Sequence, residues 1–137
     1  MGRPFAAGLM LVGAIGVPVA PAFGHHTVAA TFDVGKLVSL TGTVTSVDWK
    51  NPHVIYHLSV LDINGAAIDW EIESRHLQGM HRAGVEQDTI KTGDRVTMKV
   101  MLARDGSRHA ATASIMLGDE RAFAVCTVTN NACPPGN

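Results

Sequence analysis

The chain has 137 residues, which is enough for one domain with a single hydrophobic core. Its formal net charge of −1 gives no electrostatic footprint for nucleic acid, so a nucleic-acid-binding function is excluded. The composition therefore indicates a small globular domain whose function must come from particular side chains.

The first 24 residues have the pattern of a secretory signal peptide. Arg3 forms a short basic region, residues 5–19 are apolar and uncharged, and small residues follow up to Gly24. Several Gly and Pro residues in the apolar run argue against a buried helix. We expect a periplasmic or secreted bacterial protein. Cleavage after Gly24 leaves 113 residues with a formal charge of −2 and no stretch long enough to span a membrane.

Residues 25–119 predict an all-β domain with one short helix. An extended lead-in at 25–33 is followed by strand patterns rich in Val, Thr, Ile and aromatic residues. Gly42 predicts a bulge or tight bend in the first strand. A short helix or irregular crossover is expected within 74–90, which gives the element order β-β-β-α-β-β of a small five-stranded OB-like barrel. We predict strands at 36–49, 54–61, 68–73, 95–103 and 109–117.

The tail at 120–137 is expected to be mobile apart from a disulfide loop. Cys126 and Cys133 are the only cysteines, and an exported protein would hold them oxidised. Such a short loop would stabilise the fold by roughly 2–3 kcal/mol at most. Two thiols at this spacing without a nearby His do not match a zinc site.

The clearest chemical feature is His25-His26 beside the expected cleavage site. A cut after Gly24 makes His25 the mature N-terminus, where its α-amine and its imidazole can bind one metal ion. A further His then completes a T-shaped set of three nitrogen ligands. A cut after Ala22 instead places His25 at mature position three, where the amine and backbone amides form a square-planar chelate. Both sets of nitrogen donors favour Cu(II) in the Irving–Williams order. The alternative is that His25 and His26 are simply exposed polar residues that bind no metal.

His53 is the histidine best placed to join such a site. It lies at the Asn-Pro-His turn between two predicted strands, where it meets His25 if the lead-in folds back. His57 shares its face of the strand but lies roughly 13 Å away along it, so the two cannot chelate one ion without a bulge. The remaining histidines of the domain, His76, His81 and His109, are interpreted as surface residues.

Other residue types favour binding over catalysis. Trp49, Tyr56 and Trp70 together would supply an aromatic platform. The acidic residues that alternate along 69–73 are interpreted as a solvated strand face rather than as an acid–base pair. The sequence contains no phosphate loop, serine-nucleophile motif or HExxH motif, so no catalytic residue is assigned.

The motifs together resemble an uncharacterised family of small exported bacterial proteins, a domain of unknown function. They are His25 to Ala29, Phe32-Asp33, Leu40 to Val44, Trp49 to His53, Trp70-Glu71 and Lys91 to Asp94. The resemblance covers about residues 24–117 and implies an exported β-domain with no established activity. It also implies that a shared site would use His25, His26, Asn51, Pro52, His53, Trp70 and Glu71. Thr27-Val28, where the family has Ser-Phe, and the cysteine tail depart from the pattern.

Three functions follow, in order of preference. The first is a non-enzymatic periplasmic protein that binds copper through His25, His26 and His53. The second is an OB-type module that binds a peptide, glycan or partner protein without metal, through Trp49, Asn51, Tyr56, Trp70 and Glu71. The third is a copper oxidase-like enzyme with Tyr56 as an axial neighbour of the ion.

Overall fold

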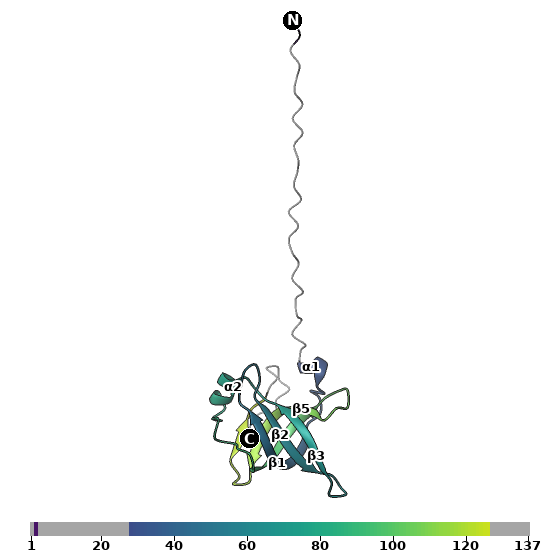
Figure 1. The fold of residues 1–137 in the computed structure, drawn as a ribbon, viewed down its shortest axis with the longest axis vertical. Helices are drawn as coiled ribbons and strands as arrows, with labels where there is room; N and C mark the ends of the chain where they lie inside the picture. The colour runs from purple at the N-terminus through teal and green to yellow at the C-terminus, as the bar shows by residue number, and fades with distance from the viewer. Residues whose placement is uncertain (1, 3–27, 127–137) are drawn as a thin grey trace.

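The computed structural model in Figure 1 describes residues 28–126 and Gly2. Strands dominate this part of the chain, and the five predicted strands all form within one or two residues of their expected ends. The elements are α1 Val28–Thr31, β1 Val38–Asp48, β2 Ile55–Leu61, β3 Ala67–Glu73, α2 Leu77–Arg82, β4 Arg95–Leu102, β5 His109–Leu117 and β6 Ala122–Ala124.

The first five strands close into a barrel, as the sequence predicts, and its strand pairing is mixed. β1 pairs antiparallel with both β2 and β4, while β2 pairs with β3 and β4 with β5. A parallel pairing of β3 with the start of β5 closes the barrel. The short helix α2 lies in the connection between β3 and β4, as expected for the predicted OB-like order.

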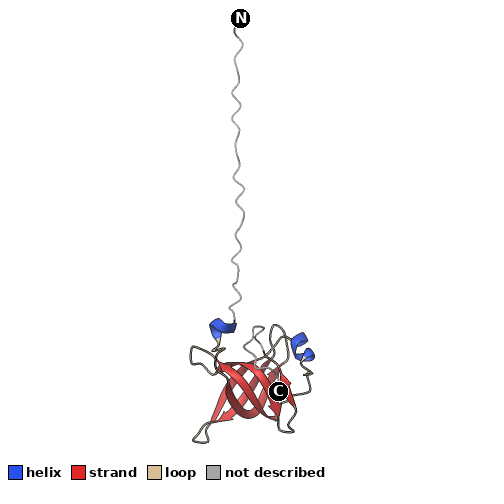
Figure 2. Ribbon diagram, turned by 180° about the vertical axis from the view of Figure 1, so that it is seen from behind, coloured by secondary structure: helices blue, strands red, loops and turns tan. Residues whose placement is uncertain are grey.

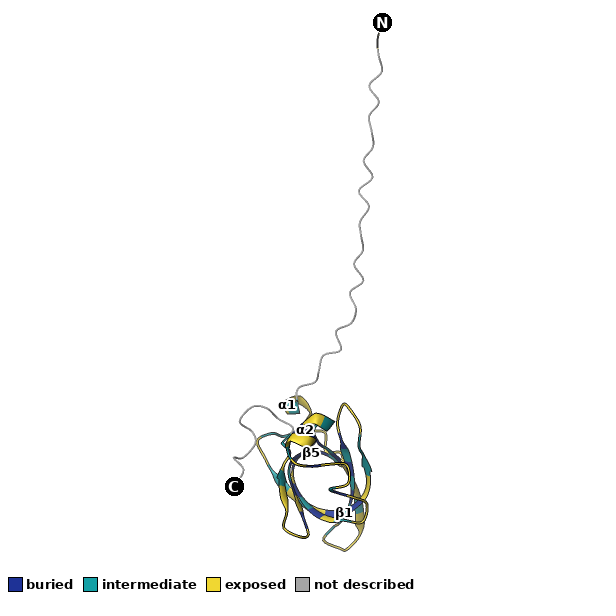
Figure 3. Ribbon diagram, turned by 90° about the vertical axis from the view of Figure 1, so that its left-hand side faces the viewer, coloured by how far each residue is buried: buried dark blue, intermediate teal, exposed yellow. Residues whose placement is uncertain are grey.

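Alternating apolar residues fill the barrel interior. Tyr56 and Leu58 of β2 face inward beside Ile72 of β3, and all three are fully buried. Trp70 is 9% exposed, whereas the acidic residues between these positions on β3 face outward. The predicted two-residue alternation of β3 is therefore confirmed, because successive strand side chains point to opposite faces. Figure 3 shows buried and exposed stretches on the barrel strands and a largely exposed α2.

Gly42 is not the bulge that the sequence predicts. The register irregularity in β1 falls between Val44 and Ser46, two residues later. At Gly42 a Cβ atom would lie 2.6 Å from the carbonyl oxygen of Ser59 and 2.9 Å from Cγ2 of Val60. Glycine is therefore needed here because the β2 backbone approaches β1 closely.

The lead-in is not extended throughout, which corrects the sequence prediction for residues 28–31. These residues form the single turn α1, and Phe32 follows with only 2% of its surface exposed. Phe32 packs with Met101 and Ala111 in a second apolar cluster on the outside of the barrel. This cluster buries Met101, while Met98 packs in the main core.

The barrel packing continues past the predicted boundary at residue 119. β6 pairs antiparallel with residues 114–116 of β5, and Val125 is fully buried in the main core. The sequence analysis missed this strand because three residues are too few to show periodicity. Cys126 is the last described residue, so the predicted partner Cys133 lies outside the described part.

Both helices lie at the same end of the barrel. Figures 1 and 2, which view the molecule from opposite sides, each show α1 and α2 beyond the same rim of the strands. This end also contains the β1–β2 turn with its Asn51-Pro52 cis peptide bond. Among the described residues, no helix is long and apolar enough to cross a membrane.

Candidate functional site

His53 lies in a depression at the helical end of the barrel. The depression has a volume of about 480 Å³ and is open to solvent. Its walls come from α1, the β1–β2 turn, the end of β3 and the segment that leads into α2. The lining residues are Val28, Asn51, Pro52, His53, Glu73, Ser74, Arg75 and His76.

Glu73 holds the His53 ring. Nδ1 of His53 lies 2.6 Å from Oε1 of Glu73. Because an ionised carboxylate only accepts hydrogen bonds, Nδ1 is the donor. The His53 side chain is 47% exposed and that of Glu73 only 18%, so the carboxylate is largely shielded while the imidazole reaches the depression.

His109 approaches the same carboxylate from β5. Its Nε2 lies 3.6 Å from Oε2 of Glu73 and 3.9 Å from Oε1 of Glu71. This nitrogen is shielded from solvent and has no hydrogen-bond partner within normal distance among the described residues. The His109 ring also has an apolar neighbour, because it meets the Phe32 ring edge-on with centroids 5.0 Å apart.

The β4–β5 connection fixes α1 beside this group. The backbone amide of Arg104 donates to the carbonyl of Thr31 at 2.9 Å, and its Nε donates to the carbonyl of Ala29 at 3.1 Å. Val28 at the start of α1 lines the His53 depression. The continuous described range, residues 28–126, therefore begins at the wall of the candidate site.

The residues predicted to bind a ligand are divided among different parts of the barrel. Asn51 lines the His53 depression, and its Oδ1 accepts a hydrogen bond from the amide of Leu77 at 3.2 Å, which holds the turn against α2. Trp49 borders a separate depression of about 320 Å³ and meets His81 edge-on. Glu71 is exposed on the outer face of β3.

The other two aromatic residues do not form an open platform with Trp49. Tyr56 is fully buried, and its hydroxyl has no hydrogen-bond partner among the described residues. Burial raises the pKa of this phenol, because the charged phenolate would lose its hydration. Trp70 is also buried, and the guanidinium of Arg108 lies over its ring, 5.4 Å from the centroid.

His57 does not join His53. Its Nε2 lies 3.8 Å from Oδ2 of Asp48, whereas His53 contacts Glu73. Each histidine thus has its own carboxylate, in keeping with the prediction that the two do not chelate one ion.

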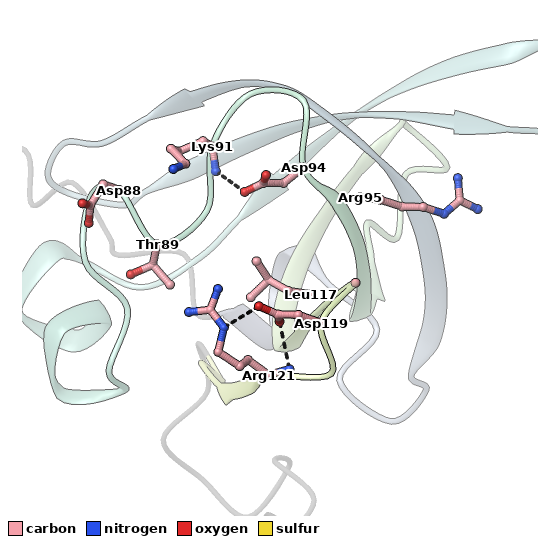
Figure 4. Close-up of a pocket in the computed structure, with 9 residues that line it drawn as sticks. Asp88, Thr89, Lys91, Asp94, Arg95, Leu117, Asp119 and Arg121 are labelled. Atoms are coloured by element: carbon pink, nitrogen blue, oxygen red, sulfur yellow. Dashed lines mark hydrogen bonds and ion pairs between the residues drawn. The ribbon is translucent and has the colours of Figure 1, made fainter.

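A third depression, of about 520 Å³, is lined mainly by charged residues from the segment before β4, the start of β4 and the β5–β6 connection (Figure 4). Two of its three carboxylates already accept local hydrogen bonds. Asp94 accepts from the amide of Lys91 at 2.8 Å, and Asp119 accepts from Nε of Arg121 at 2.8 Å. The Arg121 hydrogen bond also lowers the pKa of Asp119. We therefore place the candidate site at His53.

The described residues do not complete a metal site by themselves. Within 28–126, no group of three or more His, Cys, Asp or Glu side chains is arranged to hold an ion. The predicted ligands His25 and His26 lie outside the described residues. His53 is the one member of the predicted set whose position the structure gives.

Most of the chain matches one protein family. Residues 14–112 match the model of a family of unknown function, DUF6152. The chain belongs to the DUF6152 family. The match includes the β1–β2 turn, β3 and the start of β5, and so every described residue around His53. The comparisons with curated proteins and with solved structures found no match.

Sequence analysis of this DUF6152 chain missed Glu73 and His109 as members of the group around His53. The Asn-Gly hairpin contained a signal for Glu73, because its register pairs Leu61 with Ala67 and therefore Ile55 with Glu73. This places Glu73 diagonally opposite the turn that contains His53. His109 reaches the group through the parallel β3–β5 pairing, for which no local pattern gives a signal.

Proposed function

We propose that this small β-barrel is an exported, non-enzymatic protein that binds Cu(II) at the helical rim. The proposed ligands are the mature N-terminus with His25 and His26, together with His53. Nitrogen donors of this kind suit Cu(II), which stands highest among the divalent first-row metals in the Irving–Williams order. The proposal treats copper as a ligand and assigns no turnover to it.

The position of Val28 carries the proposal. Val28 lines the same depression as His53, and Arg104 holds the α1 turn that Val28 begins. The proposed ligands His25 and His26 precede Val28 by only three and two residues in the sequence, which supports the choice of this depression for the proposed site.

The two other functions have less support. A platform for a peptide, glycan or partner protein needs open aromatic faces, but Trp70 and Tyr56 are buried and Trp49 borders another depression. An oxidase with Tyr56 beside the ion needs the phenol at the rim, whereas its hydroxyl lies inside the barrel. We therefore favour copper binding without catalysis.

The first test uses protein exported by a bacterial host and purified without chelator or tag. Native mass spectrometry gives the mature N-terminus and any bound ion in one spectrum. We expect a chain that begins at His25 or Phe23 and carries one copper ion. Protein that stays metal-free after addition of one equivalent of Cu(II) would overturn the proposal.

The second test locates the ligands by Cu(II) titration of variants. Deletion of His25 and His26, or His53→Ala, should weaken binding by more than about a hundredfold, because even loss of an outer partner of a ligand costs about 10–100-fold. His57→Ala and His81→Ala are matched controls, since both rings are partly exposed and neither lines the depression. Equal losses in the controls, or none in the site variants, would reject the assignment.

A further inference from the structure

We infer that Glu73 is a positioning residue that fixes the His53 ring so that Nε2, and not Nδ1, faces the depression as the ligand atom. The metal part of this inference rests on the proposed function. The tautomer part does not, because it follows from contacts among described residues. A second imidazole, that of His109, lies beside the Glu73 carboxylate.

The tautomer follows from the 2.6 Å contact. Nδ1 of His53 can make it only as a donor, since the ionised Glu73 oxygen has no hydrogen to give. A neutral imidazole carries one hydrogen, so the lone pair is left on Nε2. A ring nitrogen with a free lone pair is the form that binds a metal ion.

Glu73 is well suited to position a ring that lies on a turn. It ends β3, where its backbone is paired with Ile55 on one side and with Ala111 on the other. Its carboxylate is mostly shielded, while His53 precedes β2 and is about half exposed. A rigid sheet residue thus sets the direction of a more exposed loop residue, as supporting partners of metal ligands do.

His109 lies beside the oxygen of Glu73 that does not contact His53. Its shielded Nε2 faces Oε2 of Glu73 at 3.6 Å, while Oε1 of the same carboxylate contacts His53. The carboxylate therefore lies between two imidazoles, with Oε1 toward His53 and Oε2 toward His109. When His53 gains positive character on binding an ion, this anion lies at the opposite ring nitrogen and stabilises it.

The first experiment measures the His53 tautomer without metal. Long-range ¹H–¹⁵N NMR of the folded protein should show the hydrogen on Nδ1 of His53. Glu73→Leu should remove this preference, and Glu73→Gln should retain it in part, because the amide oxygen still accepts. Asp69→Asn is the matched control, since Asp69 is an exposed carboxylate on the same face of β3 as Glu73 and does not line the depression. A wild-type hydrogen on Nε2 would overturn the inference.

The second experiment measures Cu(II) affinity in the same variants. Glu73→Gln should weaken binding by about 10–100-fold and Glu73→Leu by more, while Asp69→Asn should leave it unchanged. If the wild type binds no copper, the proposed function fails but the NMR result still decides the tautomer. If copper binds equally tightly to wild type and Glu73→Leu, the positioning role fails and the copper proposal stands.

Discussion

The ring of Phe32 meets the ring of His109 edge-on, with centroids 5.0 Å apart and planes at 70°. This contact joins the segment before β1 to the first residue of β5, two parts of the chain that are far apart in sequence. It also links the outer apolar cluster to the carboxylate group at the rim, because His109 faces Glu73 on its other side.

Phe32→Ala should lower the free energy of unfolding by about 3 kcal/mol, as the loss of a buried Phe side chain leaves a cavity. Phe32 is 2% exposed, so nearly all of its contacts would be lost. Chemical denaturation measures the change. Ile63→Ala is the control, because Ile63 is fully exposed at the β2–β3 turn and should alter stability by less than about 0.5 kcal/mol. Equal stability of both variants would contradict the role of Phe32.

Gly42→Ala should lower the free energy of unfolding by about 1–3 kcal/mol, the range for overpacked positions. The added Cβ would lie 2.6 Å from the carbonyl oxygen of Ser59, which belongs to the paired backbone and cannot move away as a side chain would. Gly35→Ala is the matched control, since its nearest atom, on Asp33, would be 3.6 Å away. A Gly42→Ala protein as stable as the control would show that the two strands can separate without cost.

Tyr56 should not ionise in the folded protein near its ordinary pKa of about 10. Burial raises its pKa, so the folded state keeps the proton that the unfolded state releases. The resulting stabilisation is complete below about pH 10 and is lost as the pH rises further. Tyr56 is the only tyrosine, so the phenolate absorbance reports it alone. We expect that absorbance to appear only together with unfolding, and a gradual rise in folded protein would contradict burial.

Tyr56→Phe should leave the free energy of unfolding unchanged or raise it by about 1 kcal/mol. The hydroxyl is buried and has no hydrogen-bond partner among the described residues, so its removal ends a desolvation cost without breaking a bond. Denaturation of the variant measures this directly. A clear loss of stability would mean that the hydroxyl makes a favourable contact.

Val125→Ala should lower the free energy of unfolding by about 2 kcal/mol, which is the transfer energy of the lost methyl groups with a small cavity term. Val125 is fully buried, and its amide donates to the carbonyl of Ala113 at 3.1 Å. Ala124→Ser, at an exposed position of β6, is the control. An unchanged Val125→Ala protein would mean that the end of the described chain contributes nothing to the barrel.

The sequence predicted part of the candidate site and missed the contacts that organise it. His53 was found because an Asn-Pro-His turn between two β-rich runs marks the rim of a hairpin. Its carboxylate partner Glu73 was assigned to a solvated face, since alternation gives the side of a strand and not its neighbours. The aromatic residues Tyr56 and Trp70 were assigned to a ligand platform because the pattern does not say which face closes on the core.

Local sequence patterns were sufficient to predict the strands, their order along the chain and the turns between them, because these depend on alternation, on β-branched residues and on turn residues such as Asn64-Gly65. Two contacts could not be predicted in this way: Phe32 covers the outside of the barrel, and His109 lies beside Glu73. Both contacts come from pairing between distant segments, the Phe32 bridge to Ala103 and the parallel β3–β5 closure. Pairing between distant segments depends on how the whole chain buries its apolar surface, so a local sequence pattern does not predict it.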